Sequence, residues 1–98
     1  MLSKSEIHQI LTSSKPHLNQ LGVSKIGFFG SAGRDEMREN SDIDILIDFE
    51  NDKETYLNFI ATCEFLESIF EAEKVDVVSV KGLSPFIGPH ILSEVEYV

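Results

Sequence analysis

The chain has 98 residues, 42% of them hydrophobic, which predicts one compact domain over residues 1–98. Its 8 basic residues stand against 17 acidic ones, giving a formal net charge of -9. That balance argues against direct binding of nucleic acid, whose backbone attracts Lys and Arg. It favours a protein that handles cations or meets a basic partner.

Cysteine content and hydropathy restrict where the protein works. Cys63 is the only cysteine, so the chain cannot form an internal disulfide, and a reducing compartment is the simplest interpretation. The N-terminal residues contain no apolar signal segment, and no apolar run approaches the length that spans a membrane. We therefore expect a cytoplasmic protein without a membrane partner.

The N-terminal segment predicts a helix. Residues 3–6 read Ser-Lys-Ser-Glu, a capping-box pattern, and the apolar residues after them follow helical spacing. Pro16 is expected to end or kink this helix, because proline lacks an N–H and crowds the preceding turn. A second short helical piece would then run to Gly22, a favourable helix stop.

Hydrophobic periodicity and turn residues predict the remaining elements. The expected ranges are a buried strand at 23–29, a polar turn at 30–41 with one helical turn near Ser31, a strictly alternating strand at 42–49, a helix at 53–71, a strand at 74–80, and a last short helix that opens at Gly88-Pro89 and runs through Val95. This order of helix, strand, turn, strand, helix, strand, helix predicts an α/β fold, with helices flanking a small mixed β-sheet.

The alternating strand carries two neighbouring carboxylates. Side chains alternate along a strand, so Asp42 and Asp44 share one face and lie about 6.5–7 Å apart. Two carboxylates at this separation repel each other unless a cation lies between them. The alternative is an ordinary solvent-exposed face of a half-buried sheet, although aspartate is a poor strand former.

A third carboxylate, Asp76, shares its row with Val78 and Val80, and an aspartate in an apolar row is costly unless it lies at the end of the sheet or binds something. Asp42, Asp44 and Asp76 all lie near the start of their strands. If these strands are parallel neighbours, the three carboxylates converge on one rim. Such hard oxygen ligands suit Mg²⁺, which keeps waters and substrate phosphates as its other ligands.

Gly30 and Ser31 follow the first predicted strand. A glycine there lets the backbone approach a ligand closely, and Ser31 offers a hydroxyl together with N–H groups of a possible helical turn. These are phosphate-binding elements. A lone Gly-Ser pair is equally compatible with a simple turn, so its significance depends on its relation to the aspartates.

Gly30-Ser31, ten intervening residues and then Asp42-Ile43-Asp44 form a pattern that resembles the signature of the nucleotidyltransferase superfamily with the DNA polymerase β fold. The chain is most similar to the minimal nucleotidyltransferases, which lack a separate base-holding domain. The resembling segments extend over almost the whole chain: "IGFFGS", "SDIDILIDF", "KVDVVSV" and "ILSEVEYV".

The resemblance implies roles for individual residues. Asp42 and Asp44 would hold two Mg²⁺ ions, and Asp76 would complete the site of the ion that activates an acceptor hydroxyl. Gly30 and Ser31 would grip the β- and γ-phosphates of a nucleoside triphosphate such as ATP, and Arg34 is expected to contact phosphate. The implied reaction transfers a nucleoside monophosphate to the hydroxyl and releases pyrophosphate.

The resemblance also implies a partner, because minimal nucleotidyltransferases are commonly paired with a helical HEPN-domain toxin. The implied function is that of an antitoxin that transfers AMP to a tyrosine hydroxyl of this toxin. Two alternatives stay open: a binding antitoxin that neutralises its partner by complex formation alone, and an enzyme that modifies a small molecule. Homo-oligomerisation is also left open.

Two departures from the family pattern bear on activity. Asp35 stands where the family usually has glycine, and its carboxylate would repel a triphosphate unless it points away. The last helix reads "IGPHIL" where relatives often carry basic residues. Both departures leave the nucleotide affinity open.

Overall fold

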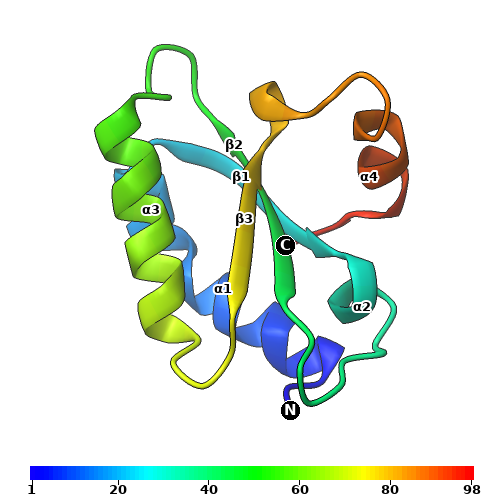
Figure 1. Ribbon diagram of the computed structural model, residues 1–98. Helices are drawn as coiled ribbons and strands as arrows, with labels where there is room; N and C mark the ends of the chain where they lie inside the picture. Colours follow the sequence, from blue (N-terminus) through cyan, green and yellow to red (C-terminus); the bar gives the residue numbers. More distant parts are fainter.

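The computed structural model describes residues 1–98, which form four α-helices, a short 3₁₀ segment and four strands (Figure 1). In chain order the elements are α1 (Lys4–Gln20), β1 (Val23–Phe29), α2 (Gly30–Gly33), β2 (Ile43–Phe49), α3 (Tyr56–Ile69), β3 (Val75–Ser79), the 3₁₀ segment η1 (Val80–Gly82), α4 (Gly88–Glu94) and β4 (Glu96–Tyr97). No helix combines the length and the apolar character needed to cross a membrane.

The four strands form one mixed sheet in the order β3-β2-β1-β4. β1 is antiparallel to both β2 and β4, whereas β2 and β3 are parallel. Figure 1 shows α3 and α4 on opposite sides of this sheet. The predicted α/β fold with a small mixed sheet flanked by helices is confirmed.

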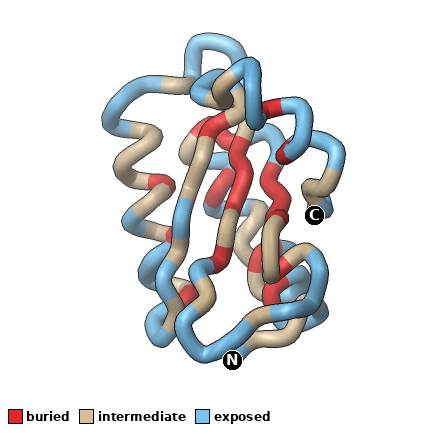
Figure 2. The backbone as a smooth tube through the Cα atoms, turned by 45° about the vertical axis from the view of Figure 1, so that its right-hand side comes forward, coloured by how far each residue is buried: buried red, intermediate tan, exposed pale blue.

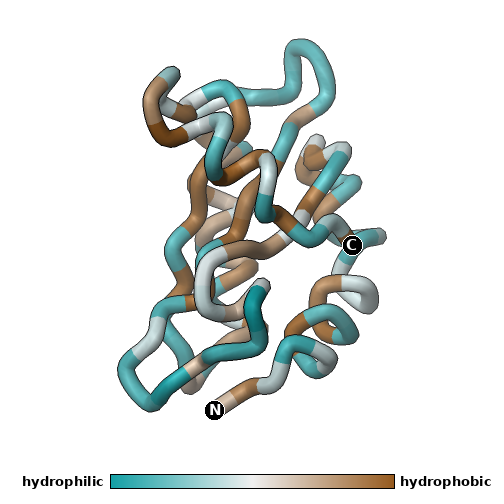
Figure 3. Tube along the Cα trace, turned by 90° about the vertical axis from the view of Figure 1, so that its right-hand side faces the viewer, coloured by the Kyte–Doolittle hydropathy of each residue, from teal (hydrophilic) through white to brown (hydrophobic).

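The alternation of β2 divides the interior into two clusters. Ile43, Ile45 and Ile47 belong to the larger cluster, which also takes in buried residues of α1 and α3. Leu46 faces the other way and packs with Phe29 and Ile91. The buried positions run along the central strands in Figure 2, and Figure 3 shows mainly hydrophobic strands joined by mainly hydrophilic loops. The sheet is therefore covered on both faces.

The expectation that Pro16 ends the first helix, with a separate helical piece after it, is wrong, because α1 continues to Gln20 with Pro16 inside it. Pro16 is exposed, and so is Thr12, whose carbonyl loses its N–H partner to the proline, so both residues lie away from the core. On either side of the proline, Leu11 and Leu18 are buried against the sheet. Packing of this apolar stripe outweighs the local cost of the proline.

The end of the chain also differs from the prediction. α4 stops at Glu94 instead of Val95, and β4 follows it and pairs with Gly27 and Phe28 of β1. A Cβ at Gly27 would lie 2.6 Å from the carbonyl oxygen of Glu96, so this glycine permits the close approach of β4. A strand of two residues is too short for a periodic pattern, which is why the sequence did not reveal it.

Candidate active site

Three aspartates lie at one end of β2 and β3. The two strands are parallel neighbours, and their register places Asp44 directly opposite Asp76. Neighbouring strands lie about 4.8 Å apart, so the two carboxylates start from adjacent backbone positions. Asp42 immediately precedes β2 and lies two residues from Asp44, on the same face. The convergence expected for parallel strands is thus present in the backbone.

The environments of the three carboxylates differ. Asp44 is half-buried, whereas Asp42 and Asp76 are exposed. Burial raises the pKa of Asp44, and the negative charges of Asp76, Asp42 and Glu94 raise it further against a smaller opposing effect of Arg34. β3 is an edge strand, so Asp76 reaches water and does not carry the burial cost that its apolar row suggested.

Gly30 lies directly against Asp44. Its φ angle of +65° is in the left-handed region, and a Cβ at this position would overlap with Oδ2 of Asp44. Glycine is therefore required at position 30 both for its backbone conformation and for the space that the carboxylate occupies. The Gly-Ser pair and the aspartates, ten residues apart in the sequence, form one site.

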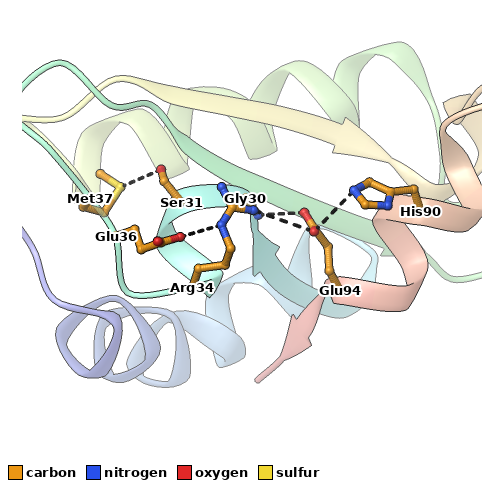
Figure 4. A network of polar contacts seen from close by, with 7 residues as sticks. All are labelled: Gly30, Ser31, Arg34, Glu36, Met37, His90 and Glu94. Carbon is orange, nitrogen blue, oxygen red and sulfur yellow. Dashed lines mark hydrogen bonds and ion pairs between the residues drawn. The ribbon is translucent and has the colours of Figure 1, made fainter.

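Gly30 begins the short helix α2, and the α2 loop, residues 30–37, carries several polar contacts (Figure 4). The backbone N–H of Gly30 donates a hydrogen bond to Oε1 of Glu94, over 3.1 Å. Arg34 lies between two carboxylates: its Nε is 2.7 Å from Oε1 of Glu36, and its Nη1 is 3.7 Å from Oε2 of Glu94. The Ser31 hydroxyl donates to the sulfur of Met37, over 3.4 Å.

Glu94 is a site residue that the sequence analysis missed. It lies on α4, 64 residues from Gly30, and no local motif marks it. Only the tertiary structure reveals the contact, because α4 and β4 return the end of the chain to the start of α2.

Asp35 does not point into the site. Its Oδ1 accepts a hydrogen bond from the backbone N–H of Lys4, at the start of α1, over 2.8 Å. Its φ angle of +56° also explains why glycine suits this position, since left-handed backbone is costly for most other residues. Aspartate is among the side chains that tolerate this conformation, so the departure from the family pattern leaves the loop intact.

The aspartates form a rim rather than a closed cage. No His, Cys, Asp and Glu side chains gather in a group of three or more that could by itself enclose a metal ion. Mg²⁺ commonly binds through one or two carboxylates and keeps waters and substrate phosphates as its other ligands. The oxygen-only donor set and the mutual repulsion that contributes to the raised pKa of Asp44 fit a divalent cation of this kind.

A hollow of about 540 Å³ opens beside Asp42 and Asp76. The other residues around it are mostly acidic and come from the last turns of α3, the connection that follows and the start of β3: Glu67, Glu71, Glu73, Lys74 and Val75. The hollow therefore adjoins the carboxylate rim on the side of α3.

Comparison with known families shows to which family the chain belongs. Residues 9–97 match the profile of the nucleotidyltransferase domain. The chain belongs to the nucleotidyltransferase family. The sequence-based identification of a minimal nucleotidyltransferase, and the prediction that the protein is an enzyme of this type, are confirmed.

Individual relatives agree with this assignment. This nucleotidyltransferase is 43% identical over 99 residues to the protein adenylyltransferase MntA of Thermococcus cleftensis, with 100% of this chain and 98% of the relative covered. A solved structure described as a minimal nucleotidyltransferase superposes with a TM-score of 0.83 at 28% identity, covering 97% of this chain and 95% of the other.

A toxin–antitoxin crystal structure with AMP-PNP has the same fold, with a TM-score of 0.66 and 22% identity. It covers 98% of this chain and 72% of the other.

Proposed function

We propose that this nucleotidyltransferase is a Mg²⁺-dependent protein adenylyltransferase. It transfers AMP from ATP to a hydroxyl, that of a tyrosine, on a HEPN-family toxin, and acts as the antitoxin of this partner. The observation that carries the proposal is the register of Asp44 opposite Asp76, with Gly30 packed against Asp44. The contact between Gly30 and Asp44 joins the carboxylate rim to the α2 loop, to which we assign phosphate binding.

The chemistry follows from the positions of these residues. Asp42 and Asp44 would hold two Mg²⁺ ions, and Asp76 would complete the site beside the acceptor. Bound Mg²⁺ supplies positive charge to the entering and leaving oxygens of an in-line displacement. The Gly30 N–H, the Ser31 hydroxyl and Arg34 bind the β- and γ-phosphates and fix the α-phosphorus near the rim.

In the transfer step, the acceptor oxygen bonds to the α-phosphorus while the bond from this phosphorus to the bridging oxygen breaks. Pyrophosphate leaves, and the hydroxyl proton passes to water. The hollow beside Asp42 and Asp76 supports entry of the acceptor from the side opposite the phosphate loop.

The relatives support the choice of nucleotide and acceptor. The 43% identical relative is named a protein adenylyltransferase, and a toxin–antitoxin structure with the same fold contains AMP-PNP. The net charge of -9 is complementary to a basic, RNA-binding partner.

The test is incubation with labelled ATP, Mg²⁺ and a HEPN partner, followed by intact-mass measurement of both proteins. We expect a gain of one or more AMP units on the partner. The gain should disappear with the Asp42→Asn/Asp44→Asn variant, or when the acceptor tyrosine of the partner is replaced by phenylalanine. Asp48→Asn, which removes a carboxylate farther along the same face of β2, is the matched control and should retain activity.

The same variants separate this proposal from the binding antitoxin. If the Asp42→Asn/Asp44→Asn variant still binds and neutralises the toxin, complex formation is sufficient and the enzymatic role in neutralisation is wrong. Transfer of AMP to a small molecule, but not to the partner, would instead favour the small-molecule alternative.

A further inference from the structure

The phosphate-binding donors of the α2 loop already have partners in the nucleotide-free structure. The Gly30 N–H donates to the Glu94 carboxylate over 3.1 Å, and Nη1 of Arg34 lies 3.7 Å from the other oxygen of the same carboxylate. Figure 4 shows Glu94 approaching the loop from α4. One carboxylate therefore engages two of the three groups assigned to the triphosphate.

We propose that Glu94 is a positioning residue that occupies the place of a phosphate and sets the nucleotide affinity. A carboxylate resembles a phosphate in its charge and in its oxygen acceptors, and both accept charge-assisted hydrogen bonds from backbone N–H groups and from arginine. This inference rests on the proposed function, because it takes the Gly30 N–H and Arg34 as phosphate ligands.

The position of Glu94 is fixed by the fold rather than by chance contact. Its side chain is 26% exposed, and α4 is anchored by the buried Ile91. β4 begins two residues later and pairs with β1. Glu94 is thus held at the loop from both sides, and it keeps the Gly30 N–H and Arg34 in place while no nucleotide is bound.

A triphosphate cannot share these donors with Glu94. Both groups are anionic, and their repulsion in a half-buried site is only partly screened by solvent. The carboxylate must leave the Gly30 N–H when the phosphate arrives. Nε2 of His90, one helical turn away, already lies 3.5 Å from Oε2 of Glu94, and the carboxylate can keep this partner when it leaves the loop.

The third donor of the loop has an equally replaceable partner. The Ser31 hydroxyl donates to the thioether sulfur of Met37, which is a weak acceptor. Exchange of this sulfur for a phosphate oxygen gains a stronger hydrogen bond. The loop is therefore preformed, with Glu94 as the competitor that limits affinity.

The test compares dissociation constants for AMP-PNP with Mg²⁺ in the wild type and in Glu94→Gln. Glutamine keeps an oxygen that can accept from the Gly30 N–H but removes the charge that competes with phosphate. We expect the dissociation constant to fall about tenfold, which corresponds to about 1.4 kcal/mol.

Glu96→Gln is the matched control, since it removes the same charge two residues away. The Glu96 carboxylate contacts Nζ of Lys4 over 2.8 Å and not the loop. We expect its dissociation constant to stay within about twofold of the wild type, because exposed charges are screened by salt. A purely structural role for Glu94 would instead lower the melting temperature and weaken nucleotide binding together.

The outcomes separate this inference from the proposed function. If the wild type binds AMP-PNP and Glu94→Gln binds no more tightly, the role of Glu94 is wrong and the proposed function stands. If neither protein binds the nucleotide, both are wrong.

A second measurement uses only the wild type, and so it tests the inference even where Glu94→Gln folds poorly. In the wild type, addition of AMP-PNP and Mg²⁺ should shift the amide NMR signals of Gly30 and the side-chain signals of Glu94. Unchanged Glu94 signals at saturation would overturn the inference.

Discussion

The carboxylate of Asp44 fills the space in which a side chain at position 30 would begin, and Gly30 has a φ angle of +65°. Gly30 directly follows the end of β1 and Asp44 lies near the start of β2, and each residue restricts what the other position can hold. The start of α2 and the carboxylate rim are therefore coupled through a direct contact.

The first prediction concerns this contact. Gly30→Ala should reduce the free energy of unfolding by about 1–2 kcal/mol from backbone strain alone. It should also displace the Asp44 carboxylate and abolish detectable AMP-PNP binding. Chemical denaturation and calorimetric titration measure the two effects. Gly82→Ala is the control, because no atom lies within 4 Å of its added Cβ, and wild-type stability in Gly30→Ala would contradict the contact.

The second prediction is that Asp44→Asn lowers activity and raises stability. Replacement by Asn should lower AMP transfer at least about a hundredfold, because a ligand of the catalytic cations is lost. Without Mg²⁺ the same variant should melt at a higher temperature than the wild type, since it removes a partly buried charge and relieves the repulsion from Asp76 and Asp42. Asp48→Asn should change neither property in this way, and a lower melting temperature for Asp44→Asn would refute the electrostatic account.

The pH dependence of the metal-free protein follows from the raised pKa of Asp44. The folded state holds this proton more tightly than the unfolded state, so ionisation of Asp44 destabilises the fold. This destabilisation is fully present above the raised pKa and disappears as the pH falls towards the ordinary carboxyl value. The stability of Asp44→Asn relative to the wild type should therefore be greatest near neutral pH and shrink in acid, as measured by denaturation at a series of pH values.

The third prediction tests the orientation of Asp35. Asp35→Asn keeps an acceptor for the Lys4 N–H and tolerates the φ angle of +56°, so stability and AMP-PNP affinity should both stay close to wild type. Asp35→Ala loses the acceptor and is strained, and it should cost about 1–3 kcal/mol of unfolding free energy. A several-fold gain in nucleotide affinity for Asp35→Asn would show that this carboxylate does repel the triphosphate.

The fourth prediction concerns the proline inside α1. Pro16→Ala should raise the free energy of unfolding by about 1–3 kcal/mol, because it restores one helical hydrogen bond and removes a steric conflict. The comparison is Asn19→Ala, an exposed position on the same helix, which gains only a few tenths of a kcal/mol from helix propensity. Equal effects of the two substitutions would mean that the proline costs the helix little.

The sequence was most informative where the chemistry is local. The strict alternation of β2 predicted both faces of the sheet, and the spacing from Gly30-Ser31 to Asp42 and Asp44 predicted a combined site. The position of Asp76 required a further assumption, that β2 and β3 are parallel neighbours, and the structure satisfies it.

The parts that the sequence did not predict depend on long-range contacts. β4 forms only because β1 offers an open edge at Gly27, and Glu94 reaches the loop only because α4 packs beside it. The continuity of α1 through Pro16 likewise depends on burial of Leu11 and Leu18 rather than on local preference. The contacts of β4 and of Glu94 leave no periodic or motif-like pattern in the chain.

The position of Asp76 on an outer strand has a consequence for solubility. β3 reads Val-Asp-Val-Val-Ser and has no neighbour on one side, so its free backbone groups could pair with a second molecule. A charge in such a strand discourages edge-to-edge association, and alanine at position 76 would leave a continuous apolar stretch there. Inactive Asp76 variants are thus best made with asparagine, and their light scattering compared with wild type, so that aggregation is not mistaken for lost chemistry.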